Sequence, residues 1–75
     1  MTLSDVLKEF GNRDFEVIEY RKVYSIDSDD VDALGGFAAY KNKSLLSMDG
    51  DNYHLNDQIS KYELYKPNWL VVWRA

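Results

Sequence analysis

The chain has 75 residues, a mass of 8.8 kDa and a formal net charge of −4, and 45% of its residues are hydrophobic, which suits one small domain over residues 1–75. It contains no Cys and one His, His54, which excludes disulfides, thiol nucleophiles and multi-histidine metal sites. No apolar run approaches the roughly 20 residues of a membrane-spanning helix, and the first residues lack the basic and apolar stretches of a signal peptide, so we expect a cytoplasmic protein.

The first predicted element is a short helix over residues 3–10. Apolar residues recur at the helical spacing i, i+3, i+4 and i+7, namely Leu3, Val6, Leu7 and Phe10. Thr2 is suited to be the N-cap, and Asp5 occupies the position that closes a capping box. Gly11 follows the last apolar residue and can adopt the left-handed conformation that ends a helix.

Residues 15–26 are rich in aromatic and β-branched side chains, which predicts a first strand. Its alternation separates two sets of side chains, Phe15 and Val17 on one face and Ile18, Tyr20 and Tyr24 on the other. A break follows, in which Ser28 is suited to cap one helical turn that continues through Val31 and Leu34.

Four more strands are predicted in the second half of the chain. Two short strands cover residues 37–40 and 45–48, with a hairpin loop between them, and a tight turn follows at residues 49–52. The last two strands, residues 59–66 and 69–74, form a hairpin with Pro67-Asn68 at its tip, because Pro fits position i+1 of a turn.

Sequential hairpins favour an antiparallel meander. The predicted fold class is therefore α+β, with a short N-terminal helix packed on a curled antiparallel sheet of about five strands, either open or barrel-like. The expected core consists of Leu3, Val6, Leu7, Phe10, Val17, Phe37, Leu45, Ile59, Leu64, Trp69 and Val71.

The acidic residues are concentrated in the middle of the chain. Seven of the thirteen acidic residues but only two of the nine basic residues lie between positions 27 and 57. Such a segment repels phosphate backbones and suits a basic surface on a partner protein. We expect an acidic partner-binding surface formed by Asp27, Asp29, Asp30, Asp32, Asp49 and Asp51. The alternative is that these residues serve turns, since Asp tolerates unusual backbone dihedrals.

A second surface is suggested by aromatic residues that alternate with Lys and Arg. Small sheets bind single-stranded nucleic acid with rings that stack on bases and cations that contact phosphates. The residues of this alternative surface are Tyr20, Tyr24, Tyr62 and Trp73. A pI near 4.7 argues against direct nucleic-acid binding, and a chain of this length needs most of its rings for the core.

The residue patterns that carry catalysis or metal binding are incomplete. The Asp clusters fail as EF-hand calcium loops, because the twelfth position counted from Asp27, Asp30 or Asp49 is never Glu. No Ser has the flanking glycines of a nucleophile elbow, and no glycine-rich stretch matches a phosphate-binding loop. We interpret His54 as a solvated or turn-bonding residue. No enzyme activity, catalytic residue, metal or cofactor is therefore expected.

Three segments, MTLSDVLKEFGNRDFEV, MDGDNYHLNDQISKYELY and WLVVW, make the chain resemble the small accessory proteins of Gram-positive prophages and mobile elements. The first is also similar to the opening of an anti-CRISPR protein that inhibits Cas9, through Leu3, Asp5, Leu7, Asn12, Asp14, Phe15 and Val17. This resemblance implies an acidic α+β protein that occupies the Cas9 groove reading the PAM duplex. The chain departs from that family by ending in an aromatic hairpin instead of a long acidic helical part, so no contact residue is carried over.

Charge placement and resemblance together predict a non-enzymatic, acidic protein-interaction module of phage type. It would act in the cytoplasm of a bacterial host, where it binds and modulates or inhibits a host protein with a basic surface, such as a CRISPR effector. Two alternatives stay open. One is a small β domain that binds single-stranded nucleic acid, and the other is a structural domain that self-associates as a homodimer.

Overall fold

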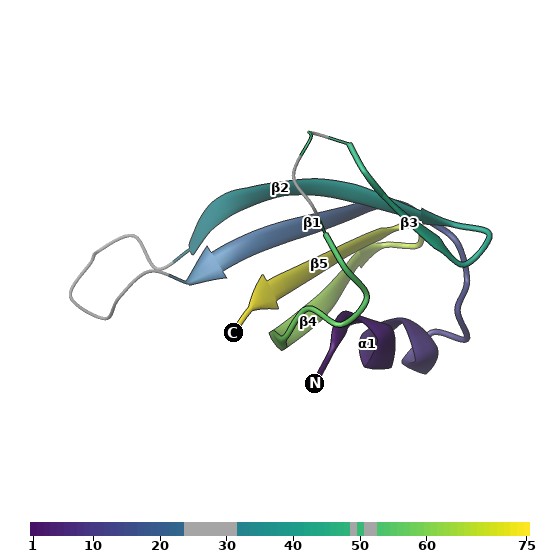
Figure 1. Ribbon diagram of the computed structural model, residues 1–75, viewed down its shortest axis with the longest axis horizontal. Helices are drawn as coiled ribbons and strands as arrows, with labels where there is room; N and C mark the ends of the chain where they lie inside the picture. Colours follow the sequence, from purple (N-terminus) through teal and green to yellow (C-terminus); the bar gives the residue numbers. More distant parts are fainter. Residues whose placement is uncertain (24–31, 49, 51–52) are drawn as a thin grey trace.

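The computed structural model describes residues 1–23, 32–48, 50 and 53–75. One helix and five strands follow one another along the chain, namely α1 (Leu3–Glu9), β1 (Phe15–Val23), β2 (Asp32–Lys41), β3 (Ser44–Ser47), β4 (Ile59–Lys66) and β5 (Trp69–Arg74) (Figure 1). The α+β class is confirmed, although strands dominate the fold. Within the described residues, no helix is long and apolar enough to cross a membrane.

Helix α1 begins with the predicted capping box. The Asp5 backbone N–H donates to the Thr2 hydroxyl (3.2 Å), and the Thr2 backbone N–H donates to the Asp5 carboxylate (3.0 Å). These hydrogen bonds, chiefly the one from the Thr2 backbone, lower the pKa of the Asp5 carboxyl below its ordinary value. Gly11 lies just beyond the C-cap residue with φ +71°, as predicted.

The five strands form one mixed sheet in the order β3-β2-β1-β5-β4. Three neighbouring pairs are antiparallel, but β1 and β5 are parallel, with Val17 opposite Trp69 and Arg21 opposite Trp73. The predicted antiparallel meander is therefore wrong, and β3 and β4 lie at opposite edges of an open sheet instead of closing a barrel.

The connection between β3 and β4 explains the mixed topology. The predicted tight turn at residues 49–52 lies largely outside the described residues, yet β3 and β4 are not neighbours, so this connection joins the two edges of the sheet. Tyr53 anchors it, because its ring stacks on Tyr20 of β1 (4.0 Å between centroids) and its hydroxyl donates to the Gly35 carbonyl (2.6 Å). The β4–β5 hairpin is thereby brought to the free edge of β1 (Figure 1).

The core lies between the sheet and the layer formed by α1 and this connection. Its buried residues are Leu3, Val6, Leu7, Phe15, Ile18, Tyr20, Ala38, Tyr40, Tyr53, Ile59, Leu70 and Val72. A register shift between Phe15 and Ile18 places Phe15 on the same face as Ile18 and Tyr20, although simple alternation predicted opposite faces.

Part of the predicted core lies elsewhere. Val17, Phe37 and Trp69 are half-buried and Val71 is buried, all on the face away from α1, and Leu64 is 42% exposed. Both faces of β5 are apolar, so the sequence pattern could not show which face the helix covers. Phe10 and Leu45 pack against the core as partly buried residues.

Strand β2 is longer than predicted and includes Leu34, which was expected in a helical turn. The rest of that turn, and the end of the first predicted strand, lie outside the described residues. A Cβ on Gly35 would meet the Tyr20 carbonyl oxygen at 3.3 Å, so β1 and β2 approach closely at this point. The predicted β2–β3 hairpin is confirmed, with Asn42 and Lys43 at its tip.

Candidate functional site

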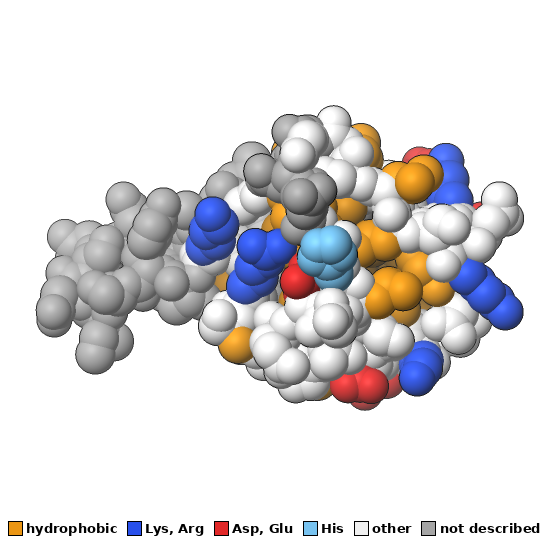
Figure 2. All heavy atoms as spheres, viewed as in Figure 1, with side chains coloured by type: hydrophobic (Ala, Val, Ile, Leu, Met, Phe, Trp, Pro, Cys, Tyr) orange, Lys and Arg blue, Asp and Glu red, His pale blue; other side chains and the backbone are white. Residues whose placement is uncertain are grey.

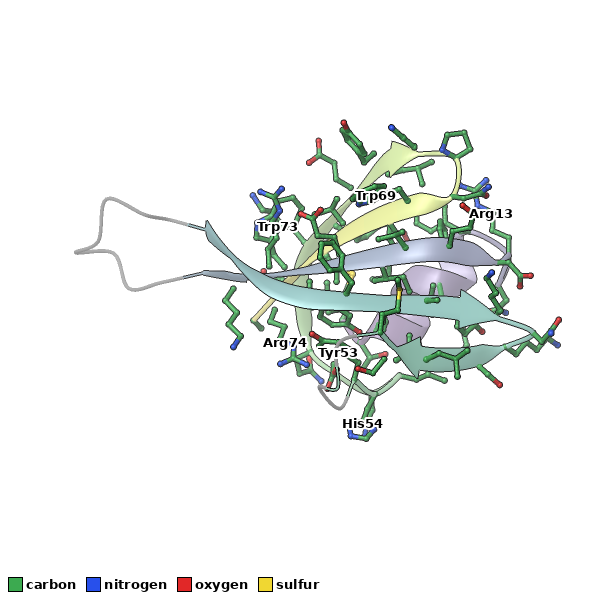
Figure 3. The ribbon with its side chains drawn as sticks, turned by 90° about the horizontal axis from the view of Figure 1, so that it is seen from above. Arg13, Tyr53, His54, Trp69, Trp73 and Arg74 are labelled. Atoms are coloured by element: carbon green, nitrogen blue, oxygen red, sulfur yellow. The ribbon has the colours of Figure 1, made fainter. Side chains whose placement is uncertain are left out.

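The face of the sheet opposite α1, here called the open face, carries the second set of strand side chains. Ala39, Val71 and Trp73 are buried but do not belong to the core beneath α1, because they alternate with core residues along β2 and β5. Figure 3 looks onto this face, with α1 behind the sheet and Trp69 and Trp73 in view. Within the described residues, no helix covers the open face.

Apolar side chains form a strip across the open face, from β3 at one edge to β4 at the other. Its members, here called the apolar strip, are Leu46, Ala39, Phe37, Val17, Trp69 and Tyr65. Leu46 lies opposite Ala39, and Val17 lies opposite Trp69. The Trp69 ring contacts the rings of Phe37 (6.5 Å between centroids) and Tyr65 (5.5 Å) edge to face.

The two ends of the apolar strip are the most accessible part of it. Leu46 is 54% exposed and Tyr65 is 64% exposed. Next to Trp69 lies a hollow of about 250 Å³, lined by Glu16, Val17, Lys66, Pro67, Asn68 and Trp69. Exposed apolar side chains that gather around a concave surface are typical of a binding site.

Charged residues beside Trp73 contact one another or the Trp73 ring. The Arg21 Nε donates to the Glu19 carboxylate (2.6 Å), and Glu19 is itself 8% exposed. The Arg21 guanidinium lies 5.7 Å from the centre of the Trp73 ring, and the Lys61 Nζ lies 4.3 Å from it. These contacts cover Trp73.

A second hollow, of about 350 Å³, adjoins this charged region. It is lined by Arg21, Glu63, Leu64, Tyr65, Val71 and Trp73. The indole N–H groups of Trp69 and Trp73 are buried and have no hydrogen-bond acceptor among the described residues. A buried donor without an acceptor costs about 1–3 kcal/mol.

The predicted aromatic surface of Tyr20, Tyr24, Tyr62 and Trp73 is not formed. Tyr20 is fully buried beneath the connection, and burial raises the pKa of its phenol above the ordinary range. Tyr62 packs on Phe10 on the side of α1 (5.8 Å between centroids), whereas Trp73 belongs to the open face. Strand alternation separates these rings, and Tyr24 lies outside the described residues.

The predicted acidic surface falls largely outside the described residues, which do not include Asp27, Asp29, Asp30, Asp49 and Asp51. Asp32 begins β2, where its backbone pairs with Val23 of β1. In the sequence, Asp27, Asp29 and Asp30 lie between β1 and β2.

His54 lies at the surface of the connection, beside the ion pair of Asp57 and Arg74. Its backbone N–H donates to the Asp57 carboxylate (3.0 Å), which also pairs with Arg74 (3.3 Å). The Ser60 hydroxyl donates to the Trp73 carbonyl. Figure 2 shows His54 at the surface beside charged side chains, with other Lys and Arg residues spaced apart on this side of the molecule. Among the described residues, no three His, Asp or Glu gather where they could hold a metal ion.

Comparison of the chain with protein-family models, curated proteins and solved structures found no match. The functional interpretation therefore depends on the open face. Sequence reasoning assigned Val17, Phe37 and Trp69 to the core, because strongly apolar residues in a short chain are usually buried. The apolar character of both faces of the last strand indicated that the sheet has two apolar faces, but it did not show which of them lies beneath α1.

Proposed function

We propose that the chain is a non-enzymatic protein-interaction module that binds a partner protein through the open face. The observation that carries the proposal is the apolar strip, which is exposed at Leu46 and Tyr65 and is flanked by two hollows. Trp, Tyr and Arg are the residue types that dominate binding energy at protein interfaces, and Trp69, Tyr65 and Arg21 supply all three.

The charge of the whole chain favours a protein partner over a nucleic acid. On the open face, Arg21 is paired with Glu19, and Glu63 lies on the same strand as Lys61 and Lys66, so the excess of positive charge there is small. The whole chain carries a net charge of −4, which opposes the approach of a polyanion. A partner with apolar residues surrounded by basic side chains fits both the apolar strip and the acidic middle of the chain.

In this proposal the acidic residues act through long-range electrostatic attraction. Asp27, Asp29, Asp30 and Asp32 would attract the basic partner and set the association rate and its salt dependence. The resemblance of the sequence to small prophage proteins suggests that the partner is a host protein, which the bound chain modulates or inhibits.

Affinity capture from a bacterial host lysate tests the proposal. The wild-type protein is compared with the double variant Leu46→Lys/Tyr65→Lys on the open face and with the control Leu55→Lys. Leu55 is 37% exposed and belongs to the connection on the side of α1. A protein captured by the wild type and the control, but lost with the double variant, supports the proposal. Equal capture by all three would show that the open face is not the interface.

The salt dependence of the same capture tests the acidic residues. Replacing Asp27, Asp29, Asp30 and Asp32 together by Asn should weaken capture at low salt and flatten its decline as salt is added. An unchanged salt dependence would remove these residues from the interface.

Binding of single-stranded nucleic acid is the second candidate, because cations lie over rings of the open face. The Lys66 Nζ is 5.4 Å from the Tyr65 ring centre and 5.9 Å from that of Trp69. Titration with oligonucleotides at low salt, followed by tryptophan fluorescence, distinguishes the two functions. Strong quenching that disappears with added salt would favour nucleic acid.

A further inference from the structure

The outer edge of β3 is a second surface without a partner. β3 pairs with β2 on its inner side, and the described residues place no strand along its outer side. The pairing with β2 is regular, and it continues just beyond the strand, where the Met48 N–H donates to the Phe37 carbonyl (3.1 Å). Residues 44–48 carry no charge, and Leu46 and Met48 are 54% and 58% exposed. An exposed apolar edge without charges favours pairing with another strand.

The opposite edge of the sheet, β4, is protected against such pairing. Lys61, Glu63 and Lys66 place charges along it, and two register shifts interrupt it. The start of its outer side is already occupied, since the Ile59 N–H donates to the Met1 carbonyl (2.7 Å). Charges and bulges are the means by which edge strands avoid pairing. Residues 44–48 have neither, so a strand that joins this sheet should join it at β3.

The hydrogen bonds of β3 show which of its backbone groups are free. Along an antiparallel strand, successive residues direct their N–H and C=O groups alternately to one neighbouring strand and to the other. Met48 donates to β2, so Leu46 and Ser44 also direct their groups inward, and Leu45 and Ser47 direct theirs outward. Each copy of the chain therefore offers the backbone donors and acceptors of Leu45 and Ser47 at this edge.

A second copy satisfies these groups best in one register. When two copies of a strand pair antiparallel about a two-fold axis perpendicular to the sheet, the residue on the axis lies opposite its own copy. With Leu46 on the axis, Leu45 of each copy lies opposite Ser47 of the other, and each of these pairs exchanges two hydrogen bonds. An axis nearer the start of β3 would set part of the edge opposite Lys43, whose φ of +62° belongs to the turn. An axis nearer its end would extend the pairing past the regular edge.

We propose that two copies of the chain pair through the outer edges of β3, antiparallel and with Leu46 on the two-fold axis. Leu46 then contacts Leu46 of the second copy at the close spacing of a non-hydrogen-bonded pair, and the exposed Met48 lies diagonally across from it on the same face. The apolar strip of each copy ends at Leu46, so the two strips join into one. The seam is confined to residues 44–48, which is less than a stable interface needs, so the dimer is weak and concentration-dependent.

Sedimentation equilibrium of the purified protein tests the seam. The wild type should show a monomer–dimer equilibrium with a Kd below about 1 mM. Leu46→Lys and Leu46→Glu should each weaken self-association at least about tenfold, because each sets like charges face to face on the axis. An equimolar mixture of the two variants should restore dimers, since opposite charges then meet. Leu55→Lys, at an exposed leucine on the side of α1, is the matched control and should leave self-association unchanged.

Single cysteines measure the register. The chain contains no Cys, so each substitution supplies the only thiol. In a non-hydrogen-bonded pair the two Cα atoms lie about 4.5 Å apart, within the range that a disulfide spans. In air, Leu46→Cys should therefore form covalent dimers at least about tenfold faster than Leu55→Cys. Ser47→Cys should also react slowly, because position 47 faces position 45 of the second copy and not its own counterpart.

Four results would overturn the proposal. They are a wild-type protein that stays monomeric up to about 1 mM, a loss of dimers with Leu55→Lys equal to that with Leu46→Lys, no recovery in the mixture of the two Leu46 variants, and equal cross-linking at positions 46 and 55. If circular dichroism shows that Leu46→Lys or Leu46→Glu is unfolded, the cross-linking rates alone decide.

Self-association is independent of the proposed function, because it needs no other protein. Tyr65→Lys, at the other end of the apolar strip, should keep its dimers in sedimentation even where it loses a captured host protein. A monomeric wild type would reject the seam and leave the proposed binding of a partner by the open face standing.

Discussion

The turn between β2 and β3 offers a sharp test of how this fold is stabilised. Its two central residues, Asn42 and Lys43, both have positive φ, +52° and +62°. This combination defines the type I′ turn, in which the second position favours Gly. Asn tolerates the left-handed region, but Lys is strained there by about 1–2 kcal/mol. The backbone N–H of Asn42 also donates to the Asp14 carboxylate (3.1 Å), which holds the turn in place.

We expect Lys43→Gly to stabilise the protein. Relief of the strain is partly offset by the greater freedom of Gly in the unfolded chain, about 0.5–1 kcal/mol. A net gain of about 0.5–1 kcal/mol corresponds to a rise in Tm of roughly 2–8 °C for a domain of this size. Thermal unfolding followed by circular dichroism measures the shift.

The matched control for this substitution is Lys43→Ala, which removes the same charge but keeps the backbone strain. It should not raise the Tm. If Lys43→Ala stabilises the protein as much as Lys43→Gly does, the effect comes from charge and the argument from backbone strain is refuted.

Further predictions concern α1 and the aromatic pair beneath the connection. Thr2→Ala should lower the free energy of unfolding by about 1 kcal/mol in urea denaturation, because it removes the side-chain half of the capping box. The pKa of Asp5 is lowered in the folded state, so the stability that Asp5 contributes is present above its unfolded-state pKa and is lost as the pH falls through its folded-state pKa. Asp5→Asn should therefore make the Tm less sensitive to acid, in thermal melts recorded between neutral and acid pH. Tyr20→Phe should leave stability unchanged or raise it by about 1 kcal/mol, because the Tyr20 hydroxyl is buried and has no hydrogen-bond partner among the described residues. Tyr53→Phe should cost about 1 kcal/mol by the same measurement, since it removes the hydrogen bond to the Gly35 carbonyl; a larger loss from Tyr20→Phe than from Tyr53→Phe would contradict this description of the pair.

Local signals in the sequence were sufficient to predict the helix and the last hairpin. Thr2 and Asp5 specify the capping box through contacts between neighbours in sequence, and Pro67-Asn68 specifies the tip between β4 and β5. Such features depend on a few adjacent residues, so their prediction from the sequence was confirmed.

The parallel pairing of β1 with β5 depends on long-range contacts instead. This pairing brings Val17 next to Trp69, although most of the chain separates them in sequence. It also depends on the connection, which Tyr53 holds against Tyr20. No local pattern encodes that contact, and sequential hairpins made the meander the simpler expectation.

The open face was missed for a related reason. In β5, Trp69 and Leu70 belong to opposite faces and both are apolar, so the pattern allowed the helix to cover either face. The register shift in β1 then moved Phe15 into the core and left Val17 on the open face.

Site-specific photo-crosslinking tests the central claim, that the open face binds a protein, most directly. A photoreactive phenylalanine analogue is placed at position 65 on the open face in one variant and at position 55, on the side of α1, in another. Both are irradiated in a bacterial host lysate. We predict a discrete protein adduct from position 65 that resists nuclease and is absent from position 55. Adducts of equal yield from both positions, or an adduct from position 65 that nuclease removes, would contradict the claim.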